Sequence, residues 1–210
     1  MKPLLLEEIT SGDLRSALVI GNFDEGLKLL QKNNYSLISL KENAMLRIQE
    51  GPYADISLYG NWVKEGVVYV PKKGKFLTNN DPINDHVEDA LDAHLQGNDF
   101  YLTNEQVEKY INVDAVELNN KSIPTNRFNE NEITNYAFGE QAEAYGNFLK
   151  ENGIDEMHIW LADLQEKPFA RKLWFWTLIG WSALIGTNRF WEFGDRCVRG
   201  VRKNLQESIR

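Results

Sequence analysis

The chain has 210 residues, a formal net charge of −8 and a single cysteine, Cys197. This length is sufficient for one domain with a sizeable core, and a lone cysteine excludes an internal disulfide. The acidic balance argues against a general nucleic-acid-binding protein, which needs an excess of Lys and Arg over one surface. Only the C-terminal end is basic, and we interpret it as a solvated tail rather than a contact site for an acidic partner.

The N-terminal segment lacks the charged, apolar and small-residue order of a secretory signal. The sequence therefore predicts a cytoplasmic protein, or one carried out by another route such as a virion. Residues 173–188 are uncharged but are interrupted by Thr177, Gly180, Ser182 and Gly186. Because a membrane-spanning helix needs about 20 apolar residues, we predict no membrane span.

The first fifty residues have the pattern of amphipathic helices. Asn22 is placed to cap a helix whose Phe23, Leu27 and Leu30 share one face. A second helix has a capping box of Ser39 and Glu42 and ends at Gly51. We therefore predict a helical N-terminal extension over residues 1–55.

Residues 56–122 form a mixed α/β segment in our interpretation. β-Branched and aromatic residues over 56–78, broken at 60–61, 64–66 and 71–74, predict two or three antiparallel strands. A helix follows over 82–98, with its predicted apolar face formed by Val87, Ala90, Leu91, His94 and Leu95. A short helix capped by Thr103 with Gln106, and then a strand over 113–119, complete the segment.

The third segment, 123–210, begins with a predicted strand at 133–139. A helix over 140–154 follows, with a core stripe of Ala142, Tyr145, Phe148 and Leu149 and with Gly153 at its C-terminal end. Residues 157–162 predict another strand. The aromatic run 173–202 predicts glycine-broken strands, because its apolar positions cover every direction of a helical wheel.

The sequence contains few motifs that could bind a metal or act in catalysis. His86 and His94 lie among acidic residues, but eight positions separate them and His94 falls on the apolar stripe, so we favour ordinary packing over a metal site. His158, beside Trp160, is also interpreted as packed. Acidic groups such as Asp114 and Glu117, or Asp155, Glu156 and Asp163, have no spacing that identifies a catalytic pair. We predict no cofactor, metal or catalytic residue.

The C-terminal third resembles the variable proteins that diversity-generating retroelements rewrite. The resemblance rests on "KPFARKLW" at 167–174, the terminal "RCVRGVR" at 196–202, and Leu178, Ser182, Leu184 and Gly186 between them. The helix at 140–154 is similar to the one that precedes the ligand-facing strands in that family and in sulfatase-modifying domains. The resemblance covers about residues 123–202, and Cys197 stands where arginine or another variable residue is expected.

The resemblance implies a C-type-lectin-like C-terminal domain. Together with the helical N-terminal extension and the small antiparallel sheets that the residue patterns predict, this gives an α+β protein. The resemblance also implies non-catalytic binding of a protein or other macromolecule, and the acidic net charge argues against nucleic acid as that partner. The implied ligand-contacting positions are Phe175, Trp176, Thr177, Ile179, Trp181, Ala183, Ile185, Thr187, Asn188, Phe190, Trp191, Phe193, Asp195 and Arg196. The implied packed frame is Leu173, Trp174, Leu178, Ser182, Leu184, Val198, Arg199 and Val201.

Two alternatives remain open at this point. One is an enzyme, either a sulfatase-modifying-type oxidase that uses Cys197 or a hydrolase with an unrecognised carboxylate pair. The oxidase needs a second cysteine or a copper-ligating pair, and the chain has one cysteine. The other is a structural protein whose aromatic residues form a permanent homo-oligomeric interface. Calcium binding is not predicted, because the C-terminal loops lack a cluster of Asp, Asn and Glu oxygens.

Overall fold

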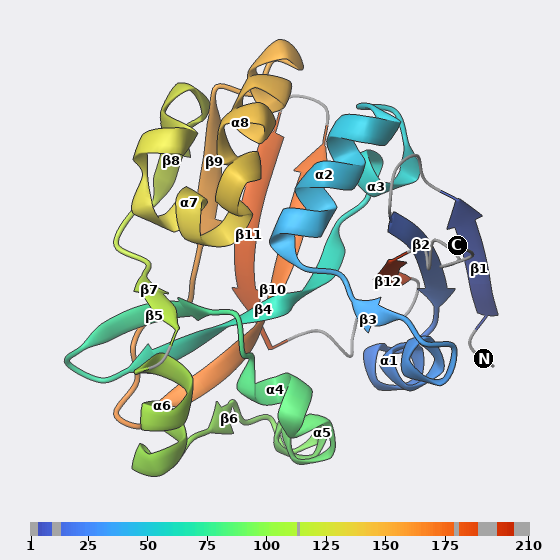
Figure 1. Cartoon of the computed structure of the whole chain (residues 1–210). Coiled ribbons are helices and arrows are strands. Elements are labelled where there is room, and N and C mark those ends of the chain that lie inside the picture. Colours follow the sequence, from blue (N-terminus) through green and yellow to red (C-terminus); the bar gives the residue numbers. More distant parts are fainter. Residues whose placement is uncertain (1–3, 10–13, 113, 179–180, 189–196, 204–210) are drawn as a thin grey trace, which may run out of the picture.

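The computed structural model describes residues 4–9, 14–112, 114–178, 181–188 and 197–203 (Figure 1). Two β-sheets and surrounding helices make up an α+β fold, which confirms the predicted class. The smaller sheet has the order β1 (Leu4–Ile9), β2 (Leu14–Ile20), β12 (Cys197–Lys203) and β3 (Ser36–Leu37). The larger sheet has the order β7 (Ala115–Glu117), β5 (Gly74–Thr78), β4 (Asn61–Val70), β10 (Phe169–Leu178), β11 (Trp181–Thr187), β9 (Glu156–Trp160) and β8 (Ser122–Pro124), and β6 (Phe100–Tyr101) pairs with β10.

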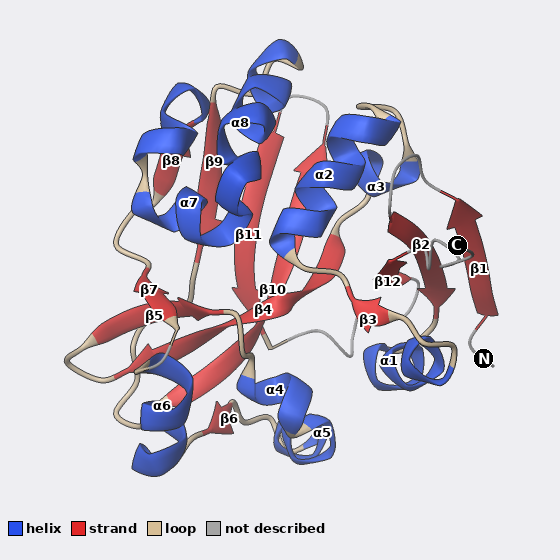
Figure 2. Ribbon diagram, viewed as in Figure 1, coloured by secondary structure: helices blue, strands red, loops and turns tan. Residues whose placement is uncertain are grey.

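Helices pack against both faces of the larger sheet. One face is covered by α2 (Leu40–Glu50), α7 (Glu132–Phe138) and α8 (Ala142–Glu151) (Figure 2), whose apolar residues share a core with inward-facing residues of the strands. α3 (Asp55–Leu58) and the short 3-10 helices η1 (Thr125–Glu130) and η2 (Gly139–Gln141) flank this layer. The second core contains residues from α1 (Phe23–Lys32), α4 (Pro82–Asp85), α5 (Val87–Leu95) and α6 (Asn104–Ile111). The larger sheet therefore separates two hydrophobic cores.

The N-terminal region contains strands that the sequence pattern did not reveal. β2 pairs antiparallel with β12 over seven residues, from Ile20 opposite Cys197 to Leu14 opposite Lys203. The prediction of a helical N-terminal extension was therefore incomplete. β2 lies inside a sheet and under α1, so Ser16 is buried together with Ala17, Leu18 and Val19. The strand therefore shows no alternation that would identify it in the sequence.

The helices predicted within the first fifty residues are confirmed. Phe23, Leu27 and Leu30 of α1 are buried, although the side chain of Asn22 makes no capping hydrogen bond. α2 has the predicted capping box: the amide of Glu42 donates to Ser39 Oγ, and the amide of Ser39 donates to Glu42 Oε2. These two bonds satisfy amides that the first helical turn cannot pair.

Replacing Ser39 by alanine is expected to lower the free energy of unfolding by about 1 kcal/mol, because it removes the acceptor of the capping box. Chemical denaturation measures the change. Ser36→Ala is the matched control, since Ser36 is exposed on β3. An equal effect of the two substitutions would contradict the importance of the cap.

Two further helices and two strands agree with the predictions. α6 begins with the capping box of Thr103 and Gln106. β7 lies within the strand predicted over 113–119, and β9 overlaps the strand predicted over 157–162 and begins one residue earlier. α8 buries Tyr145 and Leu149, and Gly153 has a positive φ of 75°. The amide of Ile154 then donates to the carbonyl of Leu149, which turns the chain back towards the core.

Three predicted elements are wrong. Residues 133–139 were predicted as a strand but belong to α7, because Asn131 caps the amides of Ile133 and Thr134 and the buried positions recur at helical spacing. The helix predicted over 82–98 divides into α4 and α5, and Leu95 is 73% exposed instead of buried. β4 runs through the break predicted at 64–66, because that stretch pairs with strands on both sides.

Candidate ligand-binding surface

Strand alternation divides the aromatic C-terminal residues between the two faces of the larger sheet. Leu173 and Phe175 of β10 and Leu184 of β11 face the helical layer and are buried in its core. The guanidinium of Arg47 lies 4.2 Å from the centre of the Phe175 ring, so α2 covers that ring. Residues with the opposite parity on β9, β10 and β11 lie on the other face.

An aromatic surface lies on that other face, and we define it by His158, Trp160, Trp176, Trp181 and Ile185. The Trp181 ring is 4.7 Å from the Trp160 ring and 4.9 Å from the Trp176 ring, measured between centroids. The His158 ring is 6.1 Å from that of Trp181 and 6.3 Å from that of Trp160. Trp160 is 49% exposed, and the other four residues are half-buried. Three strands therefore contribute one contiguous aromatic patch.

Ala183 is the small residue at the centre of the aromatic surface. It pairs with Trp176 on one side and with His158 on the other, and Trp181 precedes it by two residues on the same face. Ala183 is fully buried, because the larger side chains around it close over its methyl group. The small side chain at this position lets the tryptophan rings meet.

Replacing Ala183 by leucine is expected to separate the rings of Trp160, Trp176 and Trp181 and to lower the free energy of unfolding by about 1–3 kcal/mol, the usual cost of overpacking. The near-ultraviolet circular dichroism of the coupled indoles should decrease. Ala183→Gly is the control, because it adds no volume and should retain the indole signal. An unchanged spectrum in Ala183→Leu would contradict this arrangement.

The predicted ligand-contacting residues fall into four groups. Trp176, Trp181, Ile185, Thr187 and Asn188 are half-buried on or next to β10 and β11, where a ligand can reach them. Phe175 and Ala183 are fully buried, which corrects their assignment to the contact surface: Phe175 has the wrong strand parity, and Ala183 lies under the tryptophans. Thr177 belongs to β10, but its side chain is outside the described residues. Also outside them are Ile179, Phe190, Trp191, Phe193, Asp195 and Arg196.

The predicted frame is confirmed at seven of its positions. The buried ones are Leu173, Trp174, Ser182, Leu184, Val198, Arg199 and Val201, and the side chain of Leu178 is outside the described residues. Trp174 packs edge-on against Trp62 with a centroid distance of 4.5 Å. It also lies so close to Gly60 that a Cβ there would be 2.2 Å from its ring. Trp174 of the frame is therefore densely packed against the region of Gly60 and Trp62.

Sequence reasoning missed Trp160 and His158 as members of the surface. Both come from β9, which lies outside the aromatic run at 173–202. The signal that identifies them is the alternation along β9, in which Met157 and Ile159 are buried and His158 and Trp160 are not. A parallel pairing of β9 with β11 then brings the two segments together.

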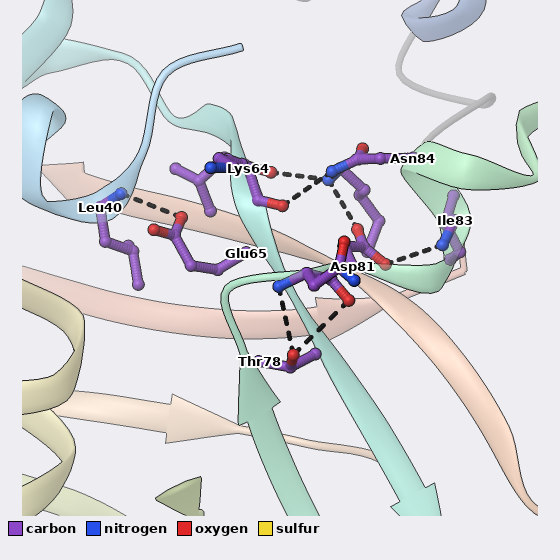
Figure 3. A network of polar contacts seen from close by, with 10 residues as sticks. Leu40, Lys64, Glu65, Thr78, Asp81, Ile83 and Asn84 are labelled. Carbon is purple, nitrogen blue, oxygen red and sulfur yellow. Dashed lines mark hydrogen bonds and ion pairs between the residues drawn. The ribbon is translucent and has the colours of Figure 1, made fainter. Parts of the chain in front are cut away.

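A buried polar network (Figure 3) holds β10 at Lys172, four residues before Trp176. Lys172 and Asp81 are both buried, and Lys172 Nζ lies 2.7 Å from Asp81 Oδ2. The same ammonium donates to the Val63 carbonyl at 2.6 Å and to Asn84 Oδ1 at 2.9 Å. Burial raises the pKa of Asp81 and lowers the pKa of Lys172, because desolvation disfavours both charged forms, and their mutual attraction opposes both shifts.

Glu65 is a second buried carboxyl group near this network. Its Oε2 accepts a hydrogen bond from the amide of Leu40 at 3.0 Å (Figure 3), which attaches the start of α2 to β4. Desolvation by burial raises the pKa of Glu65 to about 7, partly offset by backbone hydrogen bonds and by Lys172. Because these groups are buried, they support the fold and do not contact a ligand.

The histidines considered as metal ligands lie in ordinary surroundings. His86 Nδ1 is 3.5 Å from Asp89 Oδ2, and the His86 ring packs near Phe100. His94 is half-buried on α5. Across the residues that the structure describes, no three His, Cys, Asp or Glu side chains group closely enough to hold a metal ion. The same residues include no helix with the length and apolar character required to cross a membrane.

The fold is similar to a solved structure of a C-type lectin fold. No protein-family model and no curated protein matches the chain. A structure reported under the words "Accommodation of massive sequence variation in Nanoarchaeota by the C-type lectin fold" superposes with a TM-score of 0.65 and 15% sequence identity, over 93% of this chain and 100% of that chain. The C-type lectin fold is therefore shown, and the likeness extends well beyond residues 123–202.

Proposed function

We propose that this chain is a non-catalytic recognition protein that binds a protein or another macromolecule through the aromatic surface. The observation that carries the proposal is the contiguous patch of Trp160, Trp176 and Trp181 on three paired strands. Tryptophan gives a large contact area for few lost rotamers and is enriched at the energetic centres of interfaces. Exposed aromatic patches of this kind mark binding sites more often than not.

We further propose that a diversity-generating retroelement rewrites the exposed positions of this surface. The separation of buried frame and half-exposed positions on β10 and β11 supports this idea, because exposed side chains can change without loss of the packed core. The similar solved structure concerns massive sequence variation in the same fold. Neighbouring DNA tests the proposal directly: we expect a reverse transcriptase and a near-copy of codons 173–202 that differs mainly at adenines. Their absence would refute the retroelement.

A display experiment tests the binding function. One library randomises Trp160, Trp176, Trp181 and Ile185, and a matched library randomises exposed helical positions Glu105, Glu108, Glu143 and Lys150. Both are selected against the same panel of folded proteins. We expect binders from the first library at least tenfold more often than from the second, with thermal stability retained. Equal yields would contradict the proposal, and light scattering of the wild type distinguishes a permanent homo-oligomer from a free binding surface.

A further inference from the structure

An open cavity borders the aromatic surface. Its volume is about 670 Å³, and it is lined by the start of β5, the segment 117–122, β9 and the residues that follow β9. His158 and Trp160 belong both to this cavity and to the aromatic surface. A ligand that covers the aromatic surface can therefore extend into the cavity without a break.

The ladder between β8 and β9 stops at the cavity. Ile123 pairs with Met157, and the amide of Ile159 donates to the carbonyl of Lys121 at 2.8 Å. Backbone groups of odd-numbered β9 residues therefore point towards β8, since backbone direction alternates along a strand. The next rung would join Leu161 to Asn119.

That next rung is missing because the chain before β8 leaves the ladder. The amide of Leu118 donates instead to the carbonyl of Lys75 at 2.7 Å, which draws residues 117–120 towards β5. Within the described part of the chain, the backbone groups of Leu161 have no hydrogen-bond partner. The cavity is thus bounded on one side by the unpaired backbone of Leu161, directly after the end of β9, where another chain can pair and extend the strand.

The side chains around the cavity suit a neutral extended chain. Trp160 and Leu164 offer apolar surface, with exposed fractions of 49% and 40%. Asn119 and Asn120 are exposed, and among the described contacts neither side chain has a hydrogen-bond partner. Two lysines, Lys75 and Lys121, and two acids, Glu117 and Asp163, balance each other in charge. This lining does not select a strongly charged ligand.

We propose that the cavity accepts an extended peptide segment of the macromolecular ligand, which pairs its backbone with Leu161 and thereby continues the β8–β9 ladder. The inference rests on the proposed recognition function and names its ligand class as a protein with a protruding extended segment. Main-chain pairing supplies sequence-independent affinity, and the side chains of the segment contact Trp160 and the two asparagines. The backbone of Leu161 can pair with segments of any sequence, whereas the neighbouring tryptophans determine which ligand binds.

The test uses a random linear dodecapeptide library selected against the whole chain. The enriched peptides are synthesised and titrated into isotope-labelled protein, with amide and indole shifts followed by NMR. We expect shifts at 119–122 and 158–164, including the Trp160 indole. Methylation of one backbone nitrogen of the peptide, in the pairing register, should weaken binding about tenfold, because it removes a hydrogen bond and blocks the edge.

Two protein variants complete the test. Trp160→Ala should weaken peptide binding, whereas Tyr53→Ala, which removes an exposed aromatic side chain between α2 and α3, should not. Peptides that shift only Trp176 and Trp181 would overturn the cavity proposal and leave the proposed function intact. Insensitivity to every backbone methylation, failure to enrich any peptide, or occupation of the cavity by a second copy of the chain would also overturn it.

Discussion

Replacing Lys172 by methionine is expected to lower the free energy of unfolding by about 3–5 kcal/mol, the usual result of removing one partner from a buried ion pair. Asp81 would then be buried without its counter-ion, and the Val63 carbonyl and Asn84 would each lose a donor. Urea denaturation at neutral pH measures the change. Because Lys172 joins β10 to α4, loss of this contact should also increase the rate of amide hydrogen exchange in β10.

Controls separate the ion pair from other effects of the substitution. Lys150→Met changes an exposed lysine on α8 and should alter stability by less than about 0.5 kcal/mol. The double variant Lys172→Met/Asp81→Asn should be more stable than Lys172→Met by at least about 1 kcal/mol, since the buried charge is gone while the amide of Ile83 retains its acceptor. If the double variant were less stable than Lys172→Met, the unpaired charge of Asp81 would not be the cause of the lower stability of Lys172→Met.

The free energy of unfolding is expected to fall as the pH rises from about 4.5 to about 7, because of Glu65. The pKa of Glu65 is raised from an ordinary 4.5 to about 7, so the folded state binds the proton more tightly than the unfolded state. The protonated Glu65 therefore contributes to the free energy of unfolding. This contribution is fully present below pH 4.5 and is lost as the pH rises through about 7. The lost contribution is about 3 kcal/mol, from 1.36 kcal/mol for each pKa unit.

Glu65→Gln isolates this effect. The neutral amide oxygen still accepts the hydrogen bond from Leu40, so the variant should be more stable than the wild type at pH 8 by about 3 kcal/mol, with the difference closing by pH 4.5. Glu143→Gln, at an exposed position of α8, is the matched control and should follow the wild-type profile. A difference between Glu65→Gln and the wild type that stays constant from pH 4.5 to 8 would contradict the raised pKa.

Local interactions explain which elements were predicted correctly. The capping boxes at Ser39 and Thr103 and the turn at Gly153 depend on residues within five positions of one another. Their partners are therefore visible in a short window of sequence. α7 was missed because a short apolar segment fits both a strand and a helix, and its cap at Asn131 has no glutamate three residues later.

The candidate site was predicted only in part, because some of its residues come together through long-range strand pairing. The aromatic run at 173–202 correctly indicated strands with a buried frame, and Trp176 and Trp181 are on the predicted surface. The inward direction of Phe175 depends on strand parity relative to a helical layer of α2, α7 and α8, which come from separate parts of the chain. Trp160 joins the surface only through the pairing of β9 with β11, which no local pattern encodes.

The sequence by itself determined the mixed α+β class, both ends of α2, the start of α6, the turn after α8, and the frame positions that bury apolar side chains. Only the tertiary structure decided which tryptophans meet, that β2 and β12 form one sheet, and that Lys172 finds Asp81 across 91 positions. The physical reason is range: caps and periodicity act between near neighbours, whereas strand pairing and burial of charge depend on which distant segments come together.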